Sequence, residues 1–474
     1  MNKYIKKFND ASPAVKASMV LLASNLVLKG LSLISGPIFT RIMSTEQYGL
    51  VSNYNSWRDI FYVFVTLNLA SGVFNNGMLE FKTDRDRFQF SLVAITAFLT
   101  GVFFVFFQLF PKKLTSLMEL PSSLIYIMVL YYLTTPAFQF WSGRQRYEYR
   151  YKALALITIL SALTSMIVGI IAVLNTPDGN SATVKISVTE GINIAIGLFF
   201  ILYTGYRARF RINLDYCKYA LAFNIPLLPH YLSMYVLSSS DRIMITKMVG
   251  LSATAIYSVS YTVASVINIL WQSIDASLSP WIYEKLNSND KERVRAVTGM
   301  TISIFAAACL FCTLFAPEIM TILAPEEYSA GIYVIPPVTA GVFFTAMYSV
   351  YMRVELFYKQ SGFATVATSI AALVNIFLNY IFIRLFGAVA AGYTTMISYA
   401  LLAVLHYFNI KRKHYDTAFD NKKFLIMSIL VIAATCLISF TYSLSVVRYI
   451  VIATGFVLAI KNKKYIISII KTKG

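Results

Sequence analysis

The chain has 474 residues, of which 57% are hydrophobic and only 13% are charged. Soluble domains carry about 25% charged residues, so this composition excludes an ordinary water-soluble enzyme or binding domain. The formal net charge of +19 is spread over the short gaps between apolar runs and does not form one patch, which argues against nucleic acid as a partner.

Apolar runs of about twenty residues, enough to cross the ~30 Å hydrocarbon layer of a membrane, recur along the whole chain. We therefore predict an all-α integral membrane protein with about fourteen transmembrane helices. The first run is too long for the apolar part of a signal peptide and is followed by no small-residue cleavage site, so we expect it to be retained. The expected spans are 17–39, 49–74, 89–110, 123–141, 153–174, 186–206, 217–240, 252–277, 296–316, 332–352, 362–384, 388–408, 425–444 and 446–460.

Basic residues predict the orientation of these spans, because cytoplasmic loops carry an excess of lysine and arginine. If the spans alternate from a cytoplasmic N-terminus and residues at span ends are counted with the adjacent loops, 31 of the 41 basic residues fall on the cytoplasmic side, 8 on the external side and 2 deep within spans. The excess is present at every cytoplasmic segment. We therefore expect both termini in the cytoplasm.

A ten-residue motif occurs twice. Residues Arg41–Leu50 (RIMSTEQYGL) and Arg242–Leu251 (RIMITKMVGL) are identical at six of ten positions, at an offset of 201. Both copies lie at the external ends of odd-numbered spans, the first and the seventh. Because an even number of spans separates them, the two halves would be parallel repeats with a substrate path between them.

The repeat predicts the domain organisation. We expect an N-terminal six-helix lobe over residues 1–210 and a parallel C-terminal six-helix lobe over residues 211–410, arranged around a central cavity. Residues 411–474 would add a helix pair, the thirteenth and fourteenth spans, and a basic cytoplasmic tail.

Several short motifs resemble a known family. They are Pro37, Arg41 and Tyr48-Gly49 around the end of the first span; Pro226, Pro229, Asp241-Arg242, Gly250 and Tyr257 around the seventh; Pro280-Trp281 after the eighth; Tyr328 and Ile335-Pro336 before the tenth; and Gly387–Ala391 at the start of the twelfth. With this pattern the chain resembles the O-antigen and capsular polysaccharide flippases of the multidrug/oligosaccharidyl-lipid/polysaccharide exporter superfamily. The resemblance covers about residues 15–410.

The resemblance implies a function in the cytoplasmic (inner) membrane of a bacterium. The expected activity is translocation of an undecaprenyl-pyrophosphate-linked oligosaccharide by alternating access between the lobes, without enzymatic chemistry. The expected partners are this lipid-linked oligosaccharide and membrane lipids, and a polysaccharide polymerase and other assembly proteins are further candidates. No cofactor or metal site is expected, and H+ and Na+ are both open as a coupling ion.

Charged residues inside spans are candidates for the substrate site, because a charge at the middle of a bilayer costs on the order of 2.5–3.5 kcal/mol. Lys29 lies about 18 Å into the first span at 1.5 Å per residue, and Arg58 and Asp59 lie about nine residues into the second. Lys29 and Arg58 would bind the pyrophosphate, with Asp59 as a coupling group or charge partner. Alternatively, Lys29 extends to the membrane surface or pairs with Asp59, and Arg58 and Asp59 neutralise one another.

His230 lies near the middle of the seventh span, where the repeat offset pairs it with Lys29. It would line the same cavity from the second lobe, or serve as a hydrogen-bonded core residue. Arg41, Asp241 and Arg242 form a structural motif at the external membrane edge, where the last two would stabilise the turn that follows the helix.

Other functions share parts of this pattern. A peptidoglycan-precursor flippase would need the same cationic cavity. A drug or cation antiporter of the same superfamily would be expected to have an interior dominated by carboxylates, whereas Lys29 and Arg58 dominate here. A membrane polysaccharide polymerase would carry a long external loop, and every external connection expected here is short.

Overall fold

The computed structural model describes residues 12–461, and all regular secondary structure within that range is helical. Twelve of the described helices are long and apolar enough to cross a membrane. Two more, α3 (Thr45–Thr66) and α19 (Ser445–Lys461), bring the long elements to the expected number, about fourteen. The fold class predicted from the sequence is therefore confirmed, and the chain is a multi-pass membrane protein. The expected basic ends of the chain lie mostly outside the described residues.

The chain forms two compact units, Met1–Ala255 and Ile256–Gly474, which are described separately. Unit 1 contains α3 and the elements α2 (Pro13–Ile42), α4 (Val73–Glu80), α5 (Arg85–Leu109), α6 (Pro111–Met118), α7 (Ser122–Tyr147), α8 (Tyr151–Leu174), the 3-10 turn η1 (Asp178–Asn180), α9 (Ser181–Arg207), α10 (Leu214–Asn224), the 3-10 turn η2 (Ile225–Leu227) and α11 (Leu228–Met248). The lobe boundaries predicted at residues 210 and 410 stay a prediction.

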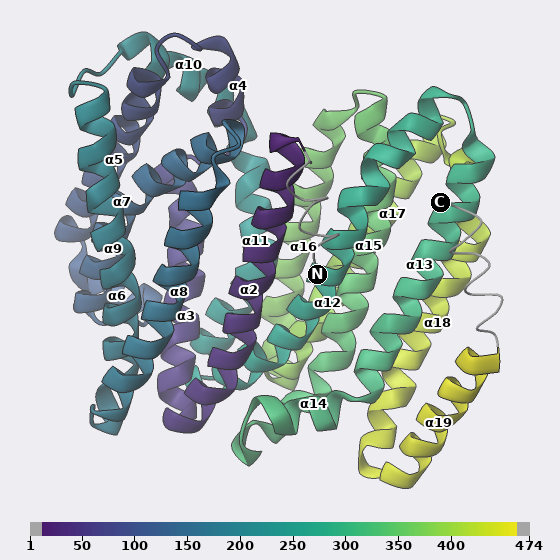
Figure 1. Ribbon diagram of the computed structural model, residues 1–474. Coiled ribbons are helices and arrows are strands. Elements are labelled where there is room, and N and C mark those ends of the chain that lie inside the picture. The colour runs from purple at the N-terminus through teal and green to yellow at the C-terminus, as the bar shows by residue number, and fades with distance from the viewer. Residues whose placement is uncertain (1–11, 462–474) are drawn as a thin grey trace, which may run out of the picture. The chain divides into compact units, whose positions relative to one another are not determined.

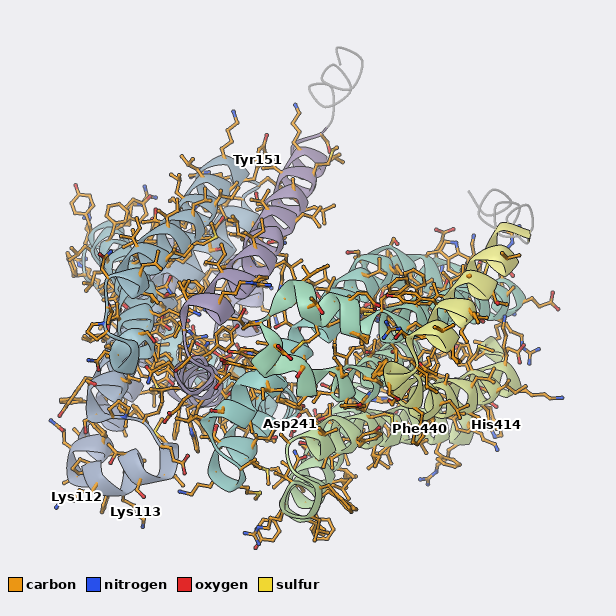
Figure 2. The ribbon with its side chains drawn as sticks, turned by 90° about the horizontal axis from the view of Figure 1, so that it is seen from below. Lys112, Lys113, Tyr151, Asp241, His414 and Phe440 are labelled. Carbon is orange, nitrogen blue, oxygen red and sulfur yellow. The ribbon has the colours of Figure 1, made fainter. Side chains whose placement is uncertain are left out.

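Helices α7 and α9 pack along each other in unit 1, α3 packs on α11, and α2 packs on α8 (Figure 1). One apolar core joins α3, α5, α6, α7 and α9, and includes Tyr54, Phe107 and Tyr132. A second core joins α4, α5, α7 and α10 around Phe74 and Phe88. The exposed lysines of α6, Lys112 and Lys113, lie at an edge of the unit (Figure 2). The side chains on α3 are thus held by helices on several sides.

Unit 2 contains most of α12 (Leu251–Asn287), followed by α13 (Lys291–Leu314), α14 (Ala316–Leu323), η3 (Glu326–Tyr333), α15 (Ile335–Phe357), α16 (Ser361–Phe386), α17 (Val389–Arg412), η4 (Asp416–Ala418), α18 (Asn421–Phe440), η5 (Thr441–Ser443) and α19. Helix α15 is buried along almost its whole length and packs against α17, α13 and α18. Figure 1 shows α15 and α17 side by side. Helix α15 is therefore the centre of this unit.

The second expected span, 49–74, is wrong as a single helix. Helix α3 ends at Thr66, and Leu67 and Asn68 have positive φ angles of 48° and 49°. The side chain of Asn224 stabilises the break, because its Nδ2 donates to the carbonyl of Leu67 at 2.8 Å and its Oδ1 accepts from the amide of Val73 at 3.3 Å. The backbone groups freed by the break are thus satisfied inside the protein, as a membrane interior requires.

Two further boundaries differ from the expectation. The seventh span, 217–240, is divided into α10 and α11 by the 3-10 turn Ile225–Leu227, where Pro226 lacks the amide hydrogen that a continuous helix needs. The eighth, expected to end at 277, continues to Asn287, with Pro280 inside the helix.

Candidate functional site

The candidate site is built on α3, a long helix with a buried polar face. Ser44 accepts a hydrogen bond from the amide of Gln47 at 3.3 Å and so caps the start of the helix. One turn before the site, Asn53 is buried and donates to the carbonyl of Met118 at 2.7 Å. These bonds hold the first half of the helix in place.

Arg58, in that next turn, is held by two carboxylates. Its Nη1 lies 2.5 Å from Glu190 Oε1 on α9, and its Nη2 and Nε lie 2.9 and 3.1 Å from Asp59 Oδ1. The side chain of Glu190 is 2% exposed, that of Arg58 is 19% exposed and that of Asp59 is 41% exposed. The guanidinium therefore has one edge on a buried partner and one edge on an accessible partner.

The formal net charge of this cluster is negative, whereas the sequence predicted a cationic cavity. Arg58 brings one positive charge, and Asp59 and Glu190 bring two negative charges when both are ionised. The local pairing of Arg58 with Asp59, expected as one alternative, is present. Glu190 was not among the predicted site residues, although a lone carboxylate inside an apolar span is the same signal that identified Arg58.

Aromatic and amide groups surround the cluster. The hydroxyl of Tyr132 donates to the carbonyl of Arg58 at 2.8 Å, and the Tyr131 ring centroid lies 5.1 Å from the guanidinium carbon. On α9, Asn193 Nδ2 donates to Glu190 Oε2 at 3.0 Å. Both oxygens of Glu190 thus have donors, which makes the carboxylate a fixed anchor and not a mobile ligand.

A second cation near the site is Lys185 on α9, which was expected outside the membrane and was not a predicted site residue. It is partly buried, and its Nζ lies 3.8 Å from the ring centroid of Phe39 and 4.9 Å from that of Tyr48. Within the described residues it makes no ion pair. Because this ammonium group faces aromatic rings and, among the described residues, no carboxylate, an anionic ligand would not have to displace a partner there.

Lys29 and His230 are not part of the Arg58 cluster. The side chain of Lys29 is exposed on α2 and, in the range 12–461, makes no hydrogen bond or ion pair. His230 is half-buried in the first turn of α11, with its ring 5.9 Å from that of Tyr231. Whether these two residues bind substrate from matched positions stays a prediction.

The repeated motif has a similar local geometry in both copies. Arg41 donates from Nη1 to the carbonyl of Pro37 at 2.9 Å, and Arg242 donates from Nη1 to the carbonyl of Ser238 at 2.8 Å. Each arginine thus binds the carbonyl four residues earlier in its own helix. Asp241, beside Arg242, is 1% exposed (Figure 2). This equivalence agrees with the internal repeat.

Comparison with known proteins supports the sequence-based expectation. A family described as polysaccharide biosynthesis protein matches residues 14–286, which is more than half of the chain. The chain belongs to this family. The predicted resemblance to polysaccharide flippases of the exporter superfamily is thus confirmed, and the matched region contains Arg58, Glu190 and Lys185.

A curated relative of this family member is a probable low-salt glycan biosynthesis flippase, Agl15, from Haloferax volcanii. The two are 24% identical over 214 residues, which cover 44% of this chain and 43% of the relative. The match therefore spans less than half the length of that protein.

Two solved structures share the fold of this family member. A lipid II flippase, MurJ, in an inward closed conformation has a TM-score of 0.68 at 14% identity, over 95% of this chain and 100% of that chain. An inward-facing multidrug resistance transporter of the MATE family in the MOP superfamily has a TM-score of 0.62 at 13% identity, over 82% of this chain and 94% of that chain. At these identities the likeness establishes the fold alone.

Proposed function

We propose that the protein is a flippase that moves an undecaprenyl-pyrophosphate-linked oligosaccharide across the cytoplasmic membrane of a bacterium, for O-antigen or capsule synthesis. The family and its flippase relative support transport of a lipid-linked sugar. The excess of basic residues in alternate loops supports cytoplasmic termini. A polymerase and other assembly proteins would receive the product, and no enzymatic step is assigned to this chain.

The observation that carries the proposal is the unequal environment of the two edges of Arg58. Glu190 is buried and holds Nη1, whereas Asp59 is accessible and holds Nη2 and Nε. A pyrophosphate oxygen can replace Asp59 at the accessible edge without disturbing the Glu190 bond. Arginine suits this exchange, because its planar donors bind carboxylate and phosphate oxygens in the same geometry.

Lys185, Lys29 and His230 would extend the contact with the substrate. Lys185 lies five residues before Glu190 on α9, about 7.5 Å along the helix axis. We propose that its ammonium group binds an acidic sugar or a second phosphate oxygen of the same substrate. Lys29 and His230 keep the role proposed from the sequence, and Asp59, once released from Arg58, is available to a coupling H+ or Na+.

A peptidoglycan-precursor flippase is the second candidate, because the fold matches a lipid II flippase over 95% of this chain. The family matched over residues 14–286 favours the polysaccharide substrate. The two candidates share a pyrophosphate, so the Arg58 exchange would serve both.

Reconstituted vesicles can separate the candidates. The purified protein is inserted into liposomes that contain either a lipid-linked oligosaccharide repeat unit or a peptidoglycan precursor, and the fraction reaching the outer leaflet is measured with a sugar-cleaving enzyme. Faster movement of the oligosaccharide lipid supports the proposal. Movement of the peptidoglycan precursor alone favours the second candidate, and movement of neither contradicts both.

A further inference from the structure

A second buried charge cluster lies in unit 2, outside the site described above. Glu355 on α15 and His406 on α17 are 1% and 0% exposed, and Glu355 Oε2 lies 2.7 Å from His406 Nδ1. Asn409, one turn after His406, donates from Nδ2 to Glu355 Oε1 at 2.8 Å. The carboxylate thus has one partner on each oxygen, and the pair joins the two helices that form the centre of this unit.

The other nitrogen of His406 is unusual. Nε2 is buried and, among the described residues, has no hydrogen-bond partner. Aromatic rings flank the imidazole: Tyr348 is nearly parallel to it at 5.8 Å between centroids, and Phe363 on α16 meets it edge-on at 5.7 Å. A buried polar atom without a partner is unfavourable, so this nitrogen calls for an explanation.

The net charge of the Glu355–His406 pair depends on the number of protons that it binds. If His406 carries a proton only on Nδ1, it is neutral and donates to an ionised Glu355, so the buried pair has a net charge of −1. A proton added at Nε2 converts the imidazole to imidazolium, and the pair becomes neutral overall. This uptake removes an uncompensated charge from the apolar interface between α15 and α17, while the new Nε2–H faces no acceptor among the described residues.

Among the described residues, no charged group on the neighbouring elements is bonded to the pair. Arg353, two residues before Glu355, bonds Asp275 of α12 at 2.5 Å, and Arg295 of α13 donates to the carbonyl of Phe419 at 3.1 Å. In the described part of unit 2, no ion pair or hydrogen bond joins Glu355 or the His406 side chain to any of the other titratable groups on the packed elements. These groups include Tyr351 on α15, Arg384 on α16, Tyr399 and Tyr407 on α17, Asp416 on η4 and Lys423 on α18.

We propose that Glu355 and His406 form a proton-binding site that takes up its proton at His406 Nε2. Glu355 lies two residues before the end of α15, and His406 lies six residues before the end of α17, the ends expected in the cytoplasm. Proton exchange therefore needs only a local opening of these two helices. The link to transport rests on the proposed flippase function: occupancy of the site sets how firmly α15 holds α17, and so makes the transport rate depend on cytoplasmic pH.

The site itself is tested without transport. Nitrogen-15 NMR of histidine-labelled protein in nanodiscs separates neutral imidazole from imidazolium, and His406→Gln identifies the His406 signal by its loss. In the full-length wild-type protein, His406 should gain a proton at Nε2 as the pH falls. Glu355→Gln should change the pH at which this step occurs, because it removes the charge that faces Nδ1. A His406 signal that stays neutral at every pH, or that titrates identically in Glu355→Gln, would overturn the proposal.

The transport arm uses the same variants in the vesicle assay. Glu355→Gln and His406→Gln should each remove at least half of the pH dependence of the wild-type rate. His414→Gln is the matched control, because His414 is exposed after the end of α17 (Figure 2). Failure of the wild-type protein to move any lipid-linked sugar refutes the flippase function, while the NMR result still decides the proton site. Titration in the NMR experiment without any change in the pH dependence of transport overturns the proposed link.

Discussion

Arg58 Nη1 on α3 lies 2.5 Å from Glu190 Oε1 on α9, so an ion pair joins two transmembrane helices of unit 1. Two further hydrogen bonds position the pair. Tyr132 donates to the Arg58 carbonyl, and Asn193 donates to the second carboxylate oxygen of Glu190. A buried ion pair adds little net stability but is costly to break from one side. Because charged groups inside membrane spans are rare and costly, this position favours a functional role for the guanidinium.

Substitution of Glu190 tests this anchor. Glu190→Ala leaves Arg58 without its buried partner, so we expect the free energy of unfolding to fall by on the order of 3–5 kcal/mol. Glu190→Gln keeps a hydrogen-bond acceptor and should be less destabilised. Thermal unfolding in detergent gives the comparison. If Glu190→Ala unfolds at the wild-type temperature, the bond contributes nothing to the fold.

Substitution of Asp59 should strengthen ligand binding. Asp59→Asn removes the negative charge that occupies the accessible edge of Arg58, so binding of pyrophosphate-containing lipid should tighten by about tenfold, equivalent to ~1.4 kcal/mol. Asp215→Asn is the control, because that carboxylate is 86% exposed and lies outside the site. Scintillation proximity binding with labelled lipid gives the affinities. Weaker binding in Asp59→Asn would show that Asp59 does not compete with the anion.

The two copies of the repeated motif meet at Gly49. A Cβ atom added there would lie 1.9 Å from the backbone oxygen of Leu251, and Thr45 donates to Ser252 at 3.1 Å beside it. Gly49→Ala should therefore force α3 away from the start of α12 and lower the unfolding temperature by several degrees or more, as for an overpacked core at a cost of about 1–3 kcal/mol. Gly101→Ala on α5, where nothing lies within 4 Å, is the control. Equal stability of the two variants would contradict the close approach.

Arg448 attaches the last described helix, α19, to α14 of the same unit. It is 4% exposed on α19 and binds Glu318 of α14, which also accepts from the hydroxyl of Tyr449 at 2.6 Å. Arg448→Ala leaves Glu318 with the tyrosine alone, so we expect α19 to become accessible to limited proteolysis and the rest of the chain to stay folded. Tyr449→Phe should have a smaller effect. Resistance to cleavage in Arg448→Ala would show that α19 is held by apolar packing.

Apolar runs predicted the fold because a membrane span must be long and apolar, whatever packs against it. The break after Thr66 was not predicted, because it depends on a contact between distant parts of the chain. It depends on the side chain of Asn224, which is more than 150 residues away in the chain. Short-range patterns in a sequence carry no record of such a contact.

The site could be predicted only in part. Arg58 and Asp59 were recognisable because charges are rare within spans, and Glu190 carried the same signal. The degree of exposure of Lys29 depends on which face of α2 packs on α8, and that face cannot be read from a helix that is apolar all round. Lys185 was expected in a loop because the predicted span began at residue 186, and its contacts with Phe39 of α2 and Tyr48 of α3 join distant parts of the chain.

The central claim is that Arg58 binds the pyrophosphate of a lipid-linked oligosaccharide during its movement across the membrane. The most direct test is the vesicle assay with Arg58→Ala, Arg58→Lys and wild-type protein at equal reconstituted amounts. We expect Arg58→Ala to lose transport and Arg58→Lys to keep part of it, because lysine retains the charge but not the planar donors. Transport at the wild-type rate by correctly inserted Arg58→Ala protein would contradict the account.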